Sequence, residues 1–313
     1  MQLFALILDS FRESLDRKIF WILLLISAVV TLAMASIGFD GERLTFFFGW
    51  LSTESYGYNP LSGLGRAKII GAVIYLILTQ VLGGVGLILM IIATAGSLPA
   101  MFDAGAIDLL LVKPISRARL FLYKYLASMV FVFVQSAAFV VATFLVMGLR
   151  WNVWAPGYLL CVPLIVLLFS YVYCVSALVA VKTRSGVAAA LVSLGAWAVF
   201  GMVTQAPAVA DLLRLDPKAP LARSLYVASW IPPKTGDIPL IAARWAGAGT
   251  SLDALPDAVM EAQSAQDRAE LDRGRSYEEQ QMRKSPWLSI GSSLLFEAVV
   301  VAWAMFIFCR KDF

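Results

Sequence analysis

Long apolar runs separated by short polar segments are the dominant pattern along the chain. The six runs cover roughly residues 20–37, 69–95, 121–148, 155–181, 186–209 and 287–309. Each run is long enough for the ~20 apolar residues that a helix needs to cross a bilayer. The pattern therefore predicts an all-α integral membrane protein with six transmembrane helices.

Lysine and arginine are distributed unevenly between the short segments on the two sides of these runs. Six spans place both termini on one side, and with the amino terminus inside, that side holds eleven of the 25 basic residues while the short loops opposite hold four. The positive-inside rule then predicts cytoplasmic termini in a multi-pass protein of a bacterial-type inner membrane. The eleven are Arg12, Arg17, Lys18, Lys113, Arg117, Arg119, Lys124, Lys182, Arg184, Arg310 and Lys311, and the four are Arg43, Arg66, Lys68 and Arg150.

Composition supports one membrane domain over residues 1–313. The chain is 60% hydrophobic and 15% charged, more apolar than a soluble domain of this length could bury. The other ten basic residues lie in a predicted extracytoplasmic loop, residues 210–286 between helices 5 and 6, where 11 acidic residues offset them. The net charge of +4 thus reflects topology, and we expect no nucleic-acid partner.

The residue inventory argues against an enzyme. The chain has no histidine, which excludes His-based zinc sites and Ser/His/Asp or Cys/His catalysis. Its three cysteines, Cys161, Cys174 and Cys309, all lie in apolar runs and suggest no disulfide framework. An intramembrane enzyme would need at least a pair of catalytic polar residues, and the predicted spans hold one carboxylate, Glu297. We predict no catalytic, metal or cofactor site.

Residues 1–18 predict an amphipathic helix along the membrane surface. Apolar residues recur there at spacings of three and four, and charged residues occupy the other face. The acidic residues at 9, 13 and 16 argue against a cleaved signal peptide. The helix either anchors the first span or docks a cytoplasmic partner.

Two predicted external segments leave their roles open. In residues 38–68, the stretch Leu44–Leu51 is apolar but too short to span, so it is interfacial or re-entrant. In residues 210–286, the Pro-Pro pair at 232–233 interrupts any continuous helix, and residues 252–284 are mostly good helix formers. We expect a small helical cap there.

Residues 96–120, between the second and third predicted spans, carry the most specific local signal. A short apolar segment, Asp108–Leu111, lies between charged residues and ends at a Lys-Pro pair. Ser116 is placed to cap a helix that begins near Arg117. The pattern predicts a short cytoplasmic helix that receives another protein.

Residues 103–124 resemble the permease subunits of ABC-2-type transporters, which are ATP-driven exporters. They read Asp-x-Gly-x-Ile-Asp-Leu-Leu-Leu-x-Lys-Pro-Ile-Ser-Arg, followed by Tyr123-Lys124. The family commonly has an acidic residue, then Gly-Thr, Leu-Leu, Pro-Ile-Ser-Arg and a Gly-Lys pair. Ala106 stands where Thr is usual, and Tyr123 where Gly is usual.

The resemblance implies a cytoplasmic coupling helix, at about residues 103–116, that a separate ATPase subunit pushes. It also implies a homodimer or heterodimer of permeases with two copies of the ATPase. ATP and Mg²⁺ would be bound by that partner, because this chain lacks the Gly-Lys dipeptide of a P-loop. The residues that the resemblance assigns to coupling are Asp103, Gly105, Ile107, Asp108, Leu110, Leu111, Pro114, Ser116 and Arg117.

Glu297 lies near the midpoint of the last predicted span, where an ionised side chain is costly, so it should face the bundle interior. Its expected partners are Gln80, Gln135, Tyr171 or Tyr173. It forms either a structural interhelical hydrogen bond or a contact with substrate or cation, and Glu297, Gln80 and Gln135 mark a candidate substrate path. The alternative function is a secondary transporter or channel driven by an ion gradient through Glu297. The sequence does not select a substrate.

Overall fold

The structure is a computed structural model that describes residues 18–40, 43–54, 63–102, 116–204, 220–246 and 285–311. Within these ranges six helices are long and apolar enough to cross a membrane. They confirm the predicted spans and indicate a multi-pass membrane protein. Residues 1–17 of the predicted interfacial helix lie outside the described residues, as do residues 103–115 of the coupling segment and residues 210–219 and 247–284 of the insertion.

The spans match the apolar runs to within a few residues, except that the second and third extend further. They cover Lys18–Ser36, Ile70–Phe102, Arg117–Trp151, Pro156–Thr183, Gly186–Thr204 and Pro286–Arg310. Spans one, three, five and six are the helices α2 (Lys18–Ser36), α6 (Arg117–Trp151), α8 (Gly186–Thr204) and α14 (Pro286–Arg310). The fourth combines η4 (Pro156–Leu160) with α7 (Cys161–Thr183).

The second span is built from pieces of different helical geometry. It passes from α3 (Gly63–Leu76) through the π-helical η2 (Ile77–Gly86) into α4 (Leu87–Thr94) and ends with the 3₁₀ turn η3 (Pro99–Phe102). A π-helical segment of this length departs from regular α-helix, and such departures often occur at functional sites. The α-helical geometry of this span is therefore interrupted midway along it.

The helix ends follow local backbone chemistry. α6 begins at Arg117, and Ser116 occupies its N-cap in extended backbone, as predicted, but the Ser116 side chain forms no cap hydrogen bond. α6 and α7 both end on a left-handed residue, Asn152 and Arg184, each with φ of 55°. This C-cap conformation reverses the chain sharply, so α8 starts two residues after Arg184.

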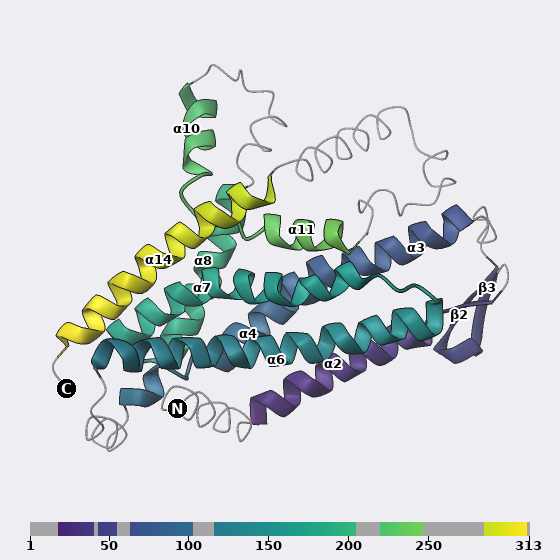
Figure 1. Cartoon of the computed structure of the whole chain (residues 1–313), viewed down its shortest axis with the longest axis horizontal. Coiled ribbons are helices and arrows are strands. Elements are labelled where there is room, and N and C mark those ends of the chain that lie inside the picture. Colours follow the sequence, from purple (N-terminus) through teal and green to yellow (C-terminus); the bar gives the residue numbers. More distant parts are fainter. Residues whose placement is uncertain are drawn as a thin grey trace.

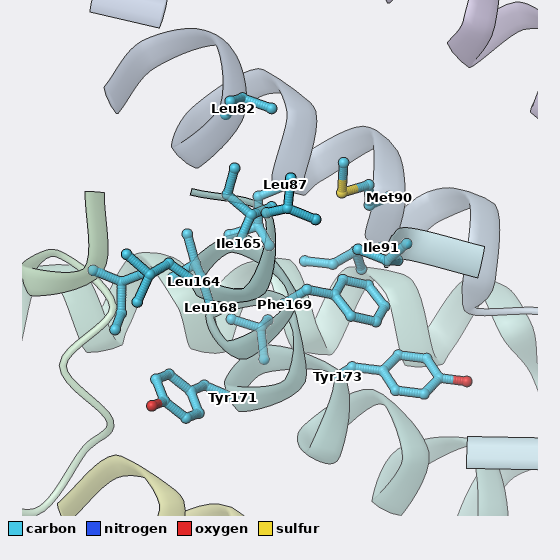
Figure 2. Packing of buried hydrophobic residues seen from close by; sticks show 14 of the residues in the cluster. Leu82, Leu87, Met90, Ile91, Leu164, Ile165, Leu168, Phe169, Tyr171 and Tyr173 are labelled. Carbon is cyan, nitrogen blue, oxygen red and sulfur yellow. The ribbon is translucent and has the colours of Figure 1, made fainter. Parts of the chain in front are cut away.

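α7 is the central helix of the bundle. It packs against α6, α8 and α14 and also contacts α4 (Figure 1). Figure 2 shows Leu87 and Ile91 of the second span directed toward Ile165 and Phe169 of α7. All four side chains are buried in one hydrophobic cluster. α2 packs mainly on α6 at the side of the bundle.

The first segment predicted to be external forms a small antiparallel sheet that the sequence did not predict. Its strands, in the order β1-β2-β3, are β1 (Gly38–Asp40), β2 (Arg43–Phe46) and β3 (Leu51–Glu54), with the 3₁₀ turn η1 (Phe47–Gly49) between the last two. The predicted apolar stretch 44–51 is therefore a hairpin. An Asp-Gly pair at residues 40–41, a typical hairpin signal, begins with the last residue of β1.

The described part of the large insertion contains two short helices, α10 (Pro220–Ala228) and α11 (Asp237–Trp245). The Pro-Pro pair at 232–233 lies in the non-helical connection between them, as predicted. α11 packs against η2, η4 and α7. Pro239 of α11 approaches Gly83 so closely that a Cβ at residue 83 would lie 2.8 Å from the proline ring.

Candidate functional site

Glu297 is held between two other spans. Tyr125 of α6 donates a hydrogen bond to Glu297 Oε1, and Ser170 of α7 donates one to Oε2, both at 2.8 Å. Neither residue was among the four expected partners, so that prediction is wrong. Tyr171, which was among them, directs its hydroxyl to the carbonyl of Ile290 instead. Neighbouring residues point about 100° apart around a helix, and a single sequence does not fix that rotation.

Three hydroxyl groups form a second polar cluster next to this carboxyl group. Ser97, Ser128 and Tyr173 lie within 2.8–3.0 Å of one another and come from the second, third and fourth spans. The rings of Tyr173 and Tyr125 have their centroids 5.3 Å apart. Together the two clusters link four of the six spans through polar groups inside the bundle. We call these six residues the polar network: Ser97, Tyr125, Ser128, Ser170, Tyr173 and Glu297.

The other two residues of the predicted substrate path lie elsewhere. Gln135 is 2% exposed and donates its amide N–H to Ser27 Oγ of α2 at 3.3 Å. Its Oε1 has no hydrogen-bond partner among the described residues. Gln80 is exposed and lines a cavity at the π-helical segment. The structure therefore does not bring Glu297, Gln80 and Gln135 together.

That cavity has a volume of about 580 Å³ and opens between the second span, α8 and α11. It is lined by apolar and neutral polar side chains, with no charged residue among them. Most of the residues that line this cavity were not predicted from the sequence, because they come from three separate segments. The lining residues are Tyr75, Thr79, Gln80, Gly83, Gly84, Trp197, Ala198, Gly201, Met202, Thr235, Gly236, Pro239 and Leu240.

Cations and aromatic rings gather where α6 begins and α14 ends. Arg117 Nη1 donates to the Lys311 carbonyl at 2.9 Å, and Lys311 Nζ donates to the carbonyl of Val181 at 2.7 Å. Arg184 and Lys311 both lie over the Phe102 ring, at 5.5 and 5.8 Å.

Phe308 of α14 also contacts Phe102, and the centroids of the two rings lie 5.9 Å apart. Burial lowers the pKa of Lys311, and the positive charge of Arg184 lowers it further. We call this cluster the basic junction: Phe102, Arg117, Arg184, Phe308 and Lys311.

The basic junction flanks the predicted coupling segment. Phe102 is the last described residue before residues 103–115, and Arg117 follows them. Of the predicted coupling residues, Ser116 and Arg117 are described, and the other seven lie outside the described ranges. Phe102 therefore contacts the ends of both α7 and α14, and Arg117 contacts the residue that follows α14.

No protein-family model matches the chain, and no curated protein matches it. The fold itself defines the class as a multi-pass membrane protein with six helices able to span the bilayer in its described part. Within that part no group of three Cys, Asp or Glu side chains could hold a metal ion.

Proposed function

We propose that this chain is the permease subunit of an ABC-2-type exporter, driven by a separate ATPase subunit. The observation that carries the proposal is the basic junction, where both flanks of the segment resembling a coupling helix are fixed to the ends of other spans. A driven element must connect firmly to the helices that it moves. The chain would work as a dimer, with ATP and Mg²⁺ bound by the partner and the basic junction on the cytoplasmic side.

The second span gives the applied force a path to the cavity. It runs from the cavity-lining residues Tyr75, Thr79 and Gln80 through the π-helical η2 into α4 and ends at Phe102 in the basic junction. π-Helical segments inside α-helices often occur at functional sites. Displacement at Phe102 would thereby alter the wall that the second span contributes to the cavity.

The cavity supports an uncharged or amphipathic substrate. Trp197 and Met202 offer apolar surface, and Gln80, Thr79 and Thr235 offer neutral hydrogen-bonding groups. A charged ligand would find no opposite charge among the lining residues. Sites of this composition suit molecules with an apolar body and a few polar groups.

The polar network supports a structural role for Glu297 within this mechanism. Both carboxyl oxygens accept hydrogen bonds from hydroxyls on two other spans. The partners join α6, α7 and α14, which are the helices that meet at the basic junction. Glu297 would then keep these spans together during movement rather than carry ions.

Site-specific photo-cross-linking in the native membrane tests the proposal. A photoreactive residue replaces Leu110, in the segment that resembles a coupling helix, and a second variant carries it at Leu149, which is exposed near the other end of α6. We expect cross-links to an ATP-binding protein from position 110 and not from 149. Absence of such a product at 110, or the same product from both positions, would contradict the proposal.

A further inference from the structure

The apolar tip of the hairpin is the most exposed hydrophobic feature of the external sheet. Trp50 is 94% exposed and Phe47 is 68% exposed, and Leu51 is also exposed. Phe47 adopts φ of +52°, a left-handed conformation that is rare for a bulky residue. Exposing these two aromatic rings together to water would not stabilise the protein. Residues 44–52 include no charged residue.

The strand register places this tip next to the end of a membrane span. β1 begins at Gly38, two residues after α2 ends, and β2 returns antiparallel so that Thr45 pairs with Gly38. The tip follows Thr45 by two residues, and η1 contacts α2. Figure 1 shows the sheet at the end of the bundle where α2 and α6 end. The tip therefore lies beside the carboxyl-terminal end of α2, the first span.

Charged residues occupy the opposite end of the same sheet. Asp40 pairs in register with Arg43, and Arg43 pairs with Glu54 on the third strand. Apolar residues occupy the other end, where Phe46 pairs with Leu51. The sheet is thus amphipathic along its strands, with the apolar end beside α2.

The neighbouring end of α6 fixes this sheet in place. Trp151 donates its indole N–H to the carbonyl of Ile37 at 3.0 Å. A Cβ at Gly38 would lie 2.8 Å from the guanidinium of Arg150. Leu149 and Trp154, each within three residues of Trp151 along the chain, are exposed, and so is Leu32, four residues before the end of α2. Tryptophan and arginine are typical of the lipid–water interface.

We propose that the hairpin tip, Phe47 with Trp50 and Leu51, inserts into the interfacial region of the bilayer on the side away from the basic junction. Its partner is the lipid surface, where acyl chains meet headgroups. α2 exposes Leu25, Val29 and Leu32 along its length, and η1 of the hairpin contacts this helix, so lipid around α2 would also reach the tip. This anchor would fix the end of α2 and hold the external sheet against the membrane. The inference requires α2 to cross the bilayer, and it is independent of the transported substrate.

Spin-label accessibility in phosphatidylcholine vesicles tests this inference on the full chain. Single labels replace Trp50 at the tip and Glu54 at the charged end, in a Cys309→Ser background, because Cys161 and Cys174 are buried. The ratio of collision rates with oxygen and with a water-soluble nickel complex reports depth. We expect a positive depth parameter at position 50 and a negative one at 54.

Two results would overturn the proposal. One is equal access of the nickel complex to positions 50 and 54, which would place the tip in water. The other is shielding of position 50 from both reagents, which would mean that protein covers it. A label at Leu51 repeats the measurement if the Trp50→Cys chain does not fold. A depth parameter at 51 that matches the value at 54 would also overturn the proposal.

Discussion

α7 and α8 follow one another along the chain and are both apolar enough to span, yet they occupy opposite environments. Buried residues make up 72% of the apolar stretch of the fourth span, which contains α7, and 11% of that of the fifth, which is α8. α7 buries large aromatic side chains such as Phe169, Tyr171 and Tyr173. α8 exposes Val187, Leu191 and Met202. Hydropathy identifies a span, and the distribution of aromatic and hydroxyl groups distinguishes its position in the bundle.

The physical reason is that lipid and protein interior are equally apolar. A leucine on α8 gains little by turning from lipid toward another helix, whereas a tyrosine hydroxyl needs a partner inside the bundle. α7 supplies Ser170 and Tyr173 to the polar network, and α8 supplies none of its members. The central helix is thus defined by close packing and hydrogen bonds.

The largest expected effect comes from removing a buried ring of α7. Phe169→Ala should lower the free energy of unfolding by about 3–5 kcal/mol, because it deletes a side chain that is fully buried between α7 and the second span. Thermal unfolding of the purified chain in detergent measures this. Leu191→Ala on α8 is the matched control and should leave the midpoint nearly unchanged. Equal losses for both variants would contradict the assignment of α7 as the central helix.

A smaller effect is expected where the second span meets α11 beside the cavity. Gly83→Ala places a methyl group 2.8 Å from the Pro239 ring and should cost about 1–3 kcal/mol as overpacking. Gly84→Ala, in the same π-helical segment, meets its nearest atom at 3.7 Å and serves as the control. Thermal midpoints of both variants should therefore differ. If Gly84→Ala destabilises as much, the close contact with α11 is not the cause.

Removing one hydroxyl from the polar network should have a lesser effect. Tyr173→Phe deletes the group that contacts Ser97 and Ser128, and hydrogen bonds between membrane helices average about 0.6 kcal/mol each. Tyr123→Phe removes a hydroxyl for which the structure gives no hydrogen bond. Chemical unfolding in mixed micelles should show a loss for the first variant and almost none for the second.

The smallest stability change is expected for Glu297→Gln, because the amide keeps one oxygen that accepts a hydrogen bond. We expect assembly to be preserved and transport to change, since the second carboxyl oxygen becomes a donor facing Ser170. Size-exclusion chromatography and uptake into vesicles measure the two properties. Unchanged transport would contradict the proposal that Glu297 holds α6, α7 and α14 together as they move.

The sequence predicted those parts of the fold that depend on local patterns. Six apolar runs located the spans, and the Ser116-Arg117 pair located the start of α6. The polarity of Glu297 predicted that it has partners inside the bundle, but the choice of Tyr125 and Ser170 depends on helix rotation and crossing. One sequence does not encode that rotation in any simple spacing.

Most of the features that the sequence did not predict join distant segments. The cavity combines residues near 80, 200 and 238, which no periodicity groups together. The basic junction joins Phe102 and Arg117 to Lys311, almost 200 residues away. The hydrophobicity of Leu44–Leu51 did not predict the hairpin of β2 and β3, because the antiparallel pairing of these two strands defines it.

Co-purifying ATP hydrolysis tests the central claim most directly. The tagged chain is purified from its native membrane beside a Leu110→Asp/Leu111→Asp variant, and nucleotide hydrolysis per chain is measured for both. The account predicts hydrolysis with the native chain and its loss with the variant, while the thermal midpoints remain the same. Hydrolysis that is absent from the native complex, or equal in both, would contradict a permease driven through residues 103–116.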